Sequence, residues 1–175
     1  MKAFRYFSPF VVLIALCASA LAQNVQTDYD KKADFSQYKT YYWNKMQTSN
    51  PLWQQHITDA VDKNLQSKGW QKIQSGGDVA VTAVAATQSQ QEYKTFYNDL
   101  AGYGWGKSEI MSTTTTTQGY QTGTLVVDMF DVKTKRSIWR GTASDAVSKK
   151  PSKNEKNLDQ AVDKMFNNFP LEAKD

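Results

Sequence analysis

The sequence predicts an α+β domain built on a mainly antiparallel, curved β-sheet with two α-helices packed on one face. Two observations lead to this prediction. Residues 123–131 and 137–147 are alternating strands joined by the short turn 132–136, which is typical of an antiparallel hairpin. The expected elements follow the order strand, strand, helix, strand, strand, strand, helix, without the regular strand–helix alternation of a parallel α/β sheet.

The first 22 residues predict an export signal that is cleaved from the mature protein. Lys2 and Arg5 precede an apolar run over residues 10–18, and the segment ends at an Ala-x-Ala cleavage site at residues 20–22. The apolar run is shorter than the roughly 20 residues that cross a bilayer core. We therefore expect cleavage after Ala22 and no transmembrane span in the mature chain.

Cys17 raises a second interpretation of this segment, a lipoprotein signal in which a lipidated cysteine begins the mature chain. The bulky Leu16 precedes it where such signals carry a small residue, and Cys17 itself lies inside the apolar run. We therefore favour a periplasmic or secreted protein over an outer-membrane lipoprotein. Because Cys17 is the only cysteine, the mature chain can use neither disulfides nor thiolate chemistry.

Residues 23–175 have a length that suits a single domain with one hydrophobic core. They carry 19 basic and 17 acidic side chains, a net charge of +2, and the basic residues are scattered along the chain. A nucleic-acid-binding protein gathers its positive charge on one face, so this class is excluded. We predict no cofactor, and nothing in the sequence indicates an oligomeric state.

The first two elements of the domain are predicted to be strands joined by a packed turn. Residues 25–30 alternate apolar or aromatic with polar side chains, as a half-buried strand does. Residues 39–43 are rich in side chains that favour β-structure. Between these strands, Phe35 and Tyr38 are expected to point into the core.

Residues 51–68 predict the first helix. Asn50 can cap the free backbone amides at the helix start, and Pro51 suits the first helical position. Mostly apolar residues then recur every three or four positions, so one face can pack on a sheet, and Gly69 supplies the stop. This stripe consists of Leu52, His56, Ile57, Ala60, Val61, Asn64 and Leu65.

Residues 78–87 predict a central strand. Its two faces carry small or β-branched side chains only, which suggests a strand that helices cover. One face consists of Val79, Val81, Ala83 and Ala85, and the other of Ala80, Thr82, Val84 and Ala86.

Residues 88–122 are predicted to form a long insertion of strand and loop, rich in aromatic residues, glycine and threonine. The run Thr113–Thr117 favours a strand because β-branched side chains suit a pleated sheet. The rings in this insertion are the best candidates for binding a ligand or partner, since exposed aromatic side chains offer flat apolar faces with polar edges. The candidate residues are Tyr93, Phe96, Tyr97, Tyr103 and Trp105. Alternatively, these rings cover the open edge of the sheet or fill the end of the core.

The last predicted helix begins at a capping box. Ser152 and Glu155 have the spacing at which each side chain can bond a free backbone amide, and the helix is expected to end at Pro170. Its apolar stripe consists of Leu158, Ala161, Val162, Met165, Phe166 and Phe169.

Short motifs, ordered along nearly all of residues 25–170, resemble those of a known family. They are Thr27-Asp28-Tyr29-Asp30, Asp34-Phe35-Ser36, Tyr38, Tyr41, Trp43, Leu65, Lys68-Gly69, Asp78, Gly123-Thr124-Leu125-Val126, Asp128, Asp131, Trp139-Arg140-Gly141 and Phe169-Pro170. In order and spacing they resemble the bacterial domain-of-unknown-function family 4136 (DUF4136). The resemblance implies an exported envelope protein, often a lipoprotein, with a compact α+β fold and no established reaction. It brings no catalytic residues, and Asp131 and Trp139 are interpreted as turn and core residues.

Catalytic and metal-binding patterns are weak in this chain. His56 is the only histidine, it lies on the apolar stripe of a helix, and no Gly-x-Ser-x-Gly motif is present. The acidic residues Asp28, Asp30 and Asp34 lack the glycine and distal glutamate of a calcium loop, so we predict no metal site.

The favoured hypothesis is a non-enzymatic binding or scaffolding module of the cell envelope whose partner is an envelope protein or a glycan. The alternative is a hydrolase that acts on an envelope glycan or peptide through the carboxylates of Asp78, Asp128 or Asp131. It requires two carboxylates within about 5–10 Å of each other in one deep cleft. A purely structural protein without a ligand is a third possibility.

Overall fold

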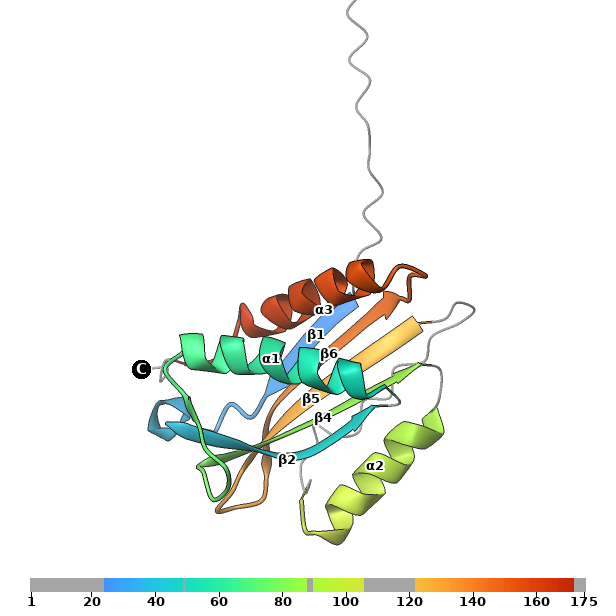
Figure 1. The fold of residues 1–175 in the computed structure, drawn as a ribbon. Helices are drawn as coiled ribbons and strands as arrows, with labels where there is room; N and C mark the ends of the chain where they lie inside the picture. Colours follow the sequence, from blue (N-terminus) through green and yellow to red (C-terminus); the bar gives the residue numbers. More distant parts are fainter. Residues whose placement is uncertain (1–23, 49, 88–89, 106–121, 172–175) are drawn as a thin grey trace, which may run out of the picture.

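The computed structural model describes residues 24–48, 50–87, 90–105 and 122–171. These residues form a six-stranded sheet, a short 3₁₀ turn (Phe35–Gln37) and three α-helices (Figure 1). The strands are β1 (Asn24–Tyr29), β2 (Thr40–Thr48), β3 (Gln71–Lys72), β4 (Val79–Thr87), β5 (Thr122–Asp131) and β6 (Ser137–Ala146). The helices are α1 (Pro51–Ser67), α2 (Gln90–Gly102) and α3 (Pro151–Phe166). The predicted export signal and the threonine run lie outside the described residues.

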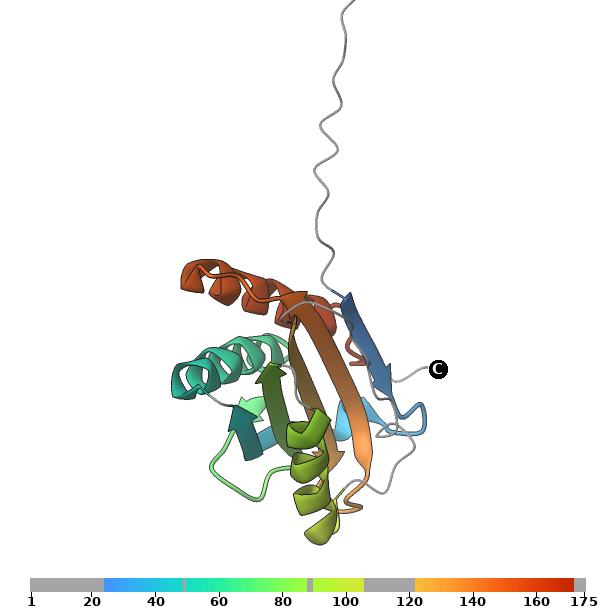
Figure 2. The ribbon, with the colours of Figure 1, turned by 90° about the vertical axis from the view of Figure 1, so that its right-hand side faces the viewer.

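The sheet is mixed, so the prediction of a mainly antiparallel sheet was wrong. Its strand order is β1-β6-β5-β4-β2-β3. The pairs β1/β6, β6/β5 and β5/β4 are antiparallel, whereas β2 runs parallel to both β4 and β3. The reason is the path through α1, since a helix between two strands provides the crossover that parallel neighbours require. The strands of this sheet are curved (Figure 2).

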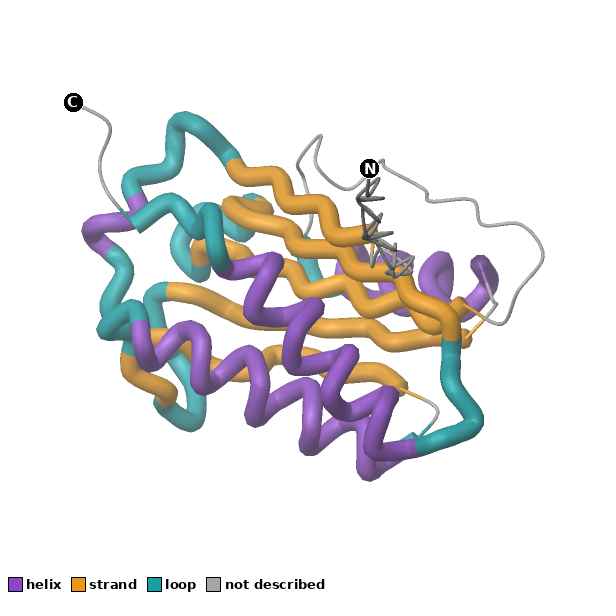
Figure 3. The backbone as a smooth tube through the Cα atoms, turned by 90° about the horizontal axis from the view of Figure 1, so that it is seen from above, coloured by secondary structure: helices purple, strands orange, loops and turns teal. Residues whose placement is uncertain are grey.

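The two predicted helices, α1 and α3, pack on one face of the sheet as expected, but a third helix, α2, covers the other face. Figure 3 shows α1 and α3 on the near side of the sheet and α2 behind it. The third helix, α2, occupies residues that were expected to form strand and loop. Within the described part of the chain, no helix has the length and apolar character needed to cross a membrane.

Each helix-bearing face of the sheet has its own hydrophobic core. The larger core lies under α1 and α3, and the smaller one lies between the sheet and α2. Strand β4 contributes to both, because Val81 belongs to the first core and Ala80 and Val84 to the second. This confirms the predicted central strand with two covered faces.

The hairpin of β5 and β6 places an aromatic ring over a glycine in the larger core. Trp139 is fully buried, and its ring packs against Phe166 and Phe169 with centroid separations of 5.0 and 5.6 Å. A Cβ atom added to Gly141 would lie 2.5 Å from Trp139 Cη2 and 2.9 Å from Met165 Sδ. The absence of a side chain at Gly141 therefore makes room for the indole of Trp139, two residues earlier in β6.

The ends of α1 agree with the sequence pattern. Asn50 Oδ1 accepts a hydrogen bond of 3.0 Å from the Leu52 backbone N–H. At the other end Gly69 adopts φ +85°, and the Trp70 N–H reaches the Leu65 carbonyl at 3.1 Å. This is the helix ending that a glycine in the left-handed region permits. Leu52, in contrast, was expected on the buried stripe but is 73% exposed.

The predicted capping box of the last helix is wrong. The N-cap residue of α3 is Lys150, whose side chain makes no capping bond, and Pro151 takes the first helical position. Ser152 therefore lies inside the first turn, where its hydroxyl cannot serve as the cap. Asn154, inside α3, holds the chain that precedes the helix, because its side chain bonds both the N–H and the carbonyl of Ser148 at 2.8 Å.

Candidate functional site

A cavity of about 300 Å³ lies between the N-terminal halves of α1 and α3, above the sheet. Its floor contains Ala85, Leu125 and Ala143, and the helices contribute apolar walls such as Ile57 and Leu158. Both helices start at the same end of the sheet and run in the same direction (Figure 1). Because the floor carries small side chains at this end, the helices do not fill the space above it.

The mouth of the cavity is polar and held by hydrogen bonds. Asn157 Nδ2 donates to Asp145 Oδ2 at 2.7 Å. The lining also includes Asn50, which caps α1, and Asn154, which fixes the turn before α3. Among the described residues that line the cavity, Asp145 is the only one with an ionisable side chain. The cavity thus has an apolar interior, a polar rim and a single carboxylate.

The opposite face of the sheet carries a buried ion pair beneath α2. Arg140 Nε donates to Asp128 Oδ1 at 2.6 Å, and Arg140 Nη2 donates to Asp128 Oδ2 at 3.0 Å. Tyr97 Oη on α2 donates to the same Oδ2 at 2.9 Å, and its ring centroid lies 5.1 Å from the guanidinium. Burial opposes the charge of Arg140, but the Asp128 carboxylate outweighs it and raises the pKa of Arg140.

The five predicted aromatic site residues belong to one structural unit but do not form one exposed surface. Phe96 and Trp105 are only 0% and 6% exposed and pack in the smaller core, so for these two rings the core-filling alternative holds and not the exposed binding surface. Tyr97 is half-buried against the ion pair, whereas Tyr103 is 78% exposed. Tyr93 lies within α2. A binding role for these residues stays a prediction.

Buried Phe96 and Trp105 follow from the way α2 ends. Gly104 adopts φ +81°, and the Trp105 N–H bonds the Leu100 carbonyl at 3.1 Å. This glycine turn directs the indole back onto the sheet, where it meets the ring of Phe130 at 5.6 Å. The ring of Phe96 packs in the same core.

Asp78 and Asp131, two of the three aspartates considered for hydrolysis, hold the turns at one end of the sheet. Asp78 Oδ2 accepts from the backbone N–H groups of Lys39 and Thr40 at 2.9 Å, and these bonds, the Lys39 amide first, lower the pKa of Asp78. Asp131 Oδ2 accepts from Tyr38 Oη at 2.9 Å. Burial opposes ionisation of Asp131, but its hydrogen bonds outweigh burial and lower its pKa.

The third aspartate, Asp128, is committed to the buried ion pair. None of the three lines the cavity between α1 and α3. The contacts of these three aspartates are therefore structural, and their side chains do not converge on this cavity.

The acidic residues near the N terminus are engaged in local turns. Asp30 Oδ1 accepts from the Lys32 N–H at 2.9 Å, and Asp34 Oδ1 accepts from the Ser36 N–H at 3.0 Å. Over the ranges that the structure describes, no three His, Cys, Asp or Glu side chains gather as metal ligands would. His56 lies at the helix surface with Nε2 3.6 Å from Glu155 Oε1.

Sequence reasoning missed a buried carboxylate on α1. Asp62 Oδ1 accepts from Tyr41 Oη and from Trp43 Nε1, each at 2.9 Å, and Asp62 Oδ2 lies 2.7 Å from Lys72 Nζ. Asp62 directly follows Val61 of the apolar stripe, and this position beside the stripe is the feature of the sequence that could have predicted its burial. The network ties α1 to β2 and β3.

Comparisons with known proteins agree with this architecture. A structure of a DUF4136 family protein from Bacteroides thetaiotaomicron is 18% identical, with a TM-score of 0.60 over 87% of this chain and 98% of that one. A PelC dodecamer from Paraburkholderia phytofirmans is 11% identical, with a TM-score of 0.52 over 88% of this chain and 100% of that one. A PDZ domain protein from Parabacteroides distasonis is 13% identical, with a TM-score of 0.57 over 86% of this chain and 36% of that one. At these identities the likeness shows the fold alone.

No curated protein matches the sequence. The family described as "Domain of unknown function (DUF4136)" matches residues 25–171, nearly the whole of the described structure. This chain therefore belongs to the DUF4136 family, as the resemblance of its motifs indicated.

Proposed function

We propose that this protein is an exported binding module of the cell envelope that performs no chemistry of its own, and that its binding site is the cavity between α1 and α3. The cavity is the observation that carries the proposal. Its volume of about 300 Å³ lies at the lower end of the range in which proteins hold small ligands or anchoring side chains. Its composition, apolar inside and polar at the mouth, is typical of such sites.

The hydrolase alternative receives no support from this cavity. Two carboxylates in one cleft are the minimum for glycoside hydrolysis by acid and base, and this lining offers Asp145 alone. Asp145 also accepts a hydrogen bond from Asn157, which holds it in the rim. We therefore place the function in recognition.

Export is the second part of the proposal and rests on residues 1–22. The intact mass of the protein from its native host tests it. Cleavage after Ala22 gives a chain that begins at Gln23, whereas a lipidated chain begins at Cys17 and carries additional acyl mass. An unprocessed chain in the cytosolic fraction would contradict export.

A photocrosslinking residue at two positions tests the binding site inside the native envelope. Val147 lines the cavity and is 44% exposed, whereas Tyr103 is exposed on the α2 side of the molecule. We expect a discrete envelope component to crosslink at position 147 and not at position 103. Crosslinking at position 103 alone would move the site to the aromatic residues of α2.

Self-association is a second candidate function, because the PelC protein of similar fold is a dodecamer. Strand β1 is the last strand on its side of the described sheet, and Gln26, Thr27 and Asp28 on it are exposed. Light scattering on the mature protein tests this candidate. A monomeric mass at micromolar concentration would remove it.

A further inference from the structure

We propose that the cavity between α1 and α3 holds the hydrocarbon chain of an anionic single-chain amphiphile, such as a fatty acid, with the head group outside the mouth, on the side of the lysines at the start of α3. This inference rests on the proposed binding function and names the chemical class of its ligand. It follows from three features of the same end of the molecule: the apolar interior, the exposed apolar side chains beside the polar groups of the mouth, and the lysines at the start of α3.

The interior suits an unbranched hydrocarbon chain. Ile57, Leu125 and Leu158 supply branched aliphatic contacts, while Ala85 and Ala143 keep the floor low. A methylene group occupies about the volume of a water molecule, roughly 30 Å³ in the liquid, so a cavity of about 300 Å³ accommodates roughly ten carbons.

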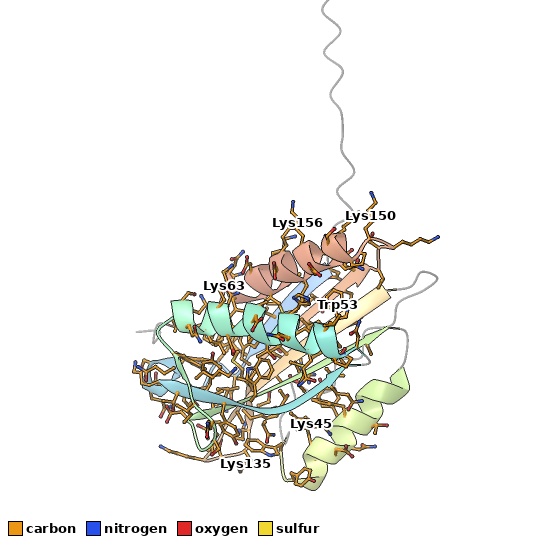
Figure 4. All side chains as sticks on the ribbon, in the orientation of Figure 1. Lys45, Trp53, Lys63, Lys135, Lys150 and Lys156 are labelled. Atoms are coloured by element: carbon orange, nitrogen blue, oxygen red, sulfur yellow. The ribbon has the colours of Figure 1, made fainter. Side chains whose placement is uncertain are left out.

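Beside its polar groups, this end of the molecule also exposes apolar side chains to solvent. Val147 lines the cavity and is 44% exposed, and Leu52 on the first turn of α1 is 73% exposed. Trp53, the next residue after Leu52, lines the cavity and is half-buried; Figure 4 labels it near the start of α1. Exposed apolar residues at the rim of an apolar cavity indicate that its occupant extends outward from the interior.

Three exposed lysines lie in the chain segment between Val147 and Asn154, two residues that line the cavity. Lys149 and Lys150 follow Val147 closely, and Lys153 lies in the first turn of α3. Figure 4 places Lys150 at the start of α3, at the cavity end of the molecule. None of these lysines lines the cavity, whose one ionisable lining group among the described residues is the carboxylate of Asp145, but the three lysines outnumber this carboxylate at the start of α3.

These lysines do not serve the stability of α3. The positive end of the helix dipole lies at the N terminus, where acidic side chains are favourable and basic ones unfavourable. The first turn of α3 has no acidic residue, and its N-cap is Lys150 without a side-chain capping bond. A local rule of helix design is thus broken beside a cavity, which is where functional residues are expected. Charge complementarity therefore favours an anionic head group over a neutral or cationic one.

A chain-length series measured by calorimetry tests the interior. Saturated fatty acids from six to fourteen carbons are titrated into the mature protein below their micelle concentrations. We expect affinity to rise about three- to fourfold per methylene up to roughly ten carbons and then to level off. Affinity that continues to rise with length, or no binding at any length, would overturn the proposal.

Substitution of Ala85 by leucine tests whether the chain enters this cavity. The added atoms occupy the floor, so we expect A85L to bind decanoate at least tenfold more weakly. The matched control is A101L, which makes the same change at an exposed position of α2 and should leave binding unchanged. If the thermal midpoint shows that A85L is unfolded, A143L fills the same floor from β6 and decides the question.

The head-group preference is tested by removing the charges of the lysines at the start of α3. We expect K149Q/K150Q/K153Q to weaken decanoate binding roughly fivefold at low salt and to leave binding of uncharged decanol unchanged. The control K31Q/K32Q/K133Q removes the same charge from exposed lysines elsewhere and should have no effect.

Two outcomes separate this inference from the proposed binding function. If decanol and decanoate bind equally and A85L weakens both, the cavity is a binding site but the anionic preference is wrong. If anionic vesicles bind the protein and A85L binds them equally well, the lysines act as a membrane surface patch and the cavity proposal is wrong. The crosslink at position 147 reports on the proposed function independently of both.

Discussion

Removal of the Arg140 guanidinium should be the most damaging single change to the polar structure of this protein. In R140M the carboxylate of Asp128, which is 1% exposed, stays buried with Tyr97 as its remaining partner. Breaking a buried ion pair from one side costs about 3–5 kcal/mol, because the other charge is left uncompensated. A domain of this size has a total stability of about 5–15 kcal/mol, so R140M approaches the limit of folding.

The double variant shows whether this cost comes from the orphaned charge. In D128L/R140M both charges are replaced by apolar side chains, and the Tyr97 hydroxyl, on a half-buried residue, can turn to water. We expect the double variant to be more stable than R140M by about 2 kcal/mol or more, since apolar replacement of a buried pair is often neutral.

Urea denaturation measures the free energies of unfolding, and heating measures the thermal midpoints, both followed by circular dichroism. The thermal midpoint of R140M should fall by about 6–20 °C for a chain of this length. A loss below about 1 kcal/mol in R140M, or a loss in the double variant equal to the sum of the losses in the single variants D128L and R140M, would refute the reasoning. Either result would mean that the pair is hydrated and not desolvated beneath α2.

Three further substitutions, and G123A as a control for the first, test the fold. G141A should destabilise the protein by about 2 kcal/mol or more, because its Cβ would lie 2.5 Å from the Trp139 ring, whereas G123A meets only a side-chain methyl at 3.2 Å and should be tolerated. G104A should cost about 1–2 kcal/mol in urea denaturation, because φ +81° is unfavourable for any side chain. The folded-state pKa of Asp78 lies below 3.8, so its stabilising effect is present above that pH and is lost as the pH falls through the folded pKa. D78N should therefore be less stable at neutral pH and lose less stability on acidification, and an unchanged acid transition would contradict this.

Local patterns in the sequence were sufficient to predict most elements of the fold. The alternation in residues 78–87 identified β4 as a covered strand, and Asn50 with Gly69 marked both ends of α1. These signals are reliable because each depends on a backbone group and its immediate neighbours.

The missed helix α2 had a recognisable ending. Tyr103-Gly104-Trp105 repeats the pattern of Lys68-Gly69-Trp70 at the end of α1, and in both cases the glycine has positive φ and the tryptophan N–H bonds back into the helix. The aromatic and glycine content of residues 93–105 suggested a loop instead. This helix contains aromatic residues because it packs on the sheet through them, as Phe96 does.

The parallel pairing and the cavity could not be predicted from local patterns. The pairing of β2 with β4 depends on where the chain places β2 after α1 is packed, which is a long-range property. The cavity depends on the separation of two helices over Ala85 and Ala143, and small residues alone do not indicate whether helices close over them. The burial of Asp128 likewise depends on its partner Arg140 across the hairpin.

The central claim is that recognition takes place in the cavity between α1 and α3, and the indole N–H signals of the five tryptophans test it directly. Of these residues, only Trp53 lines the described cavity, while Trp105 lies under α2. In a two-dimensional ¹H–¹⁵N titration with decanoate, we expect the Trp53 indole signal to shift in a saturable way and the Trp105 signal to stay in place. A saturable shift of Trp105 with Trp53 unchanged would contradict the account and return the site to the aromatic residues of α2.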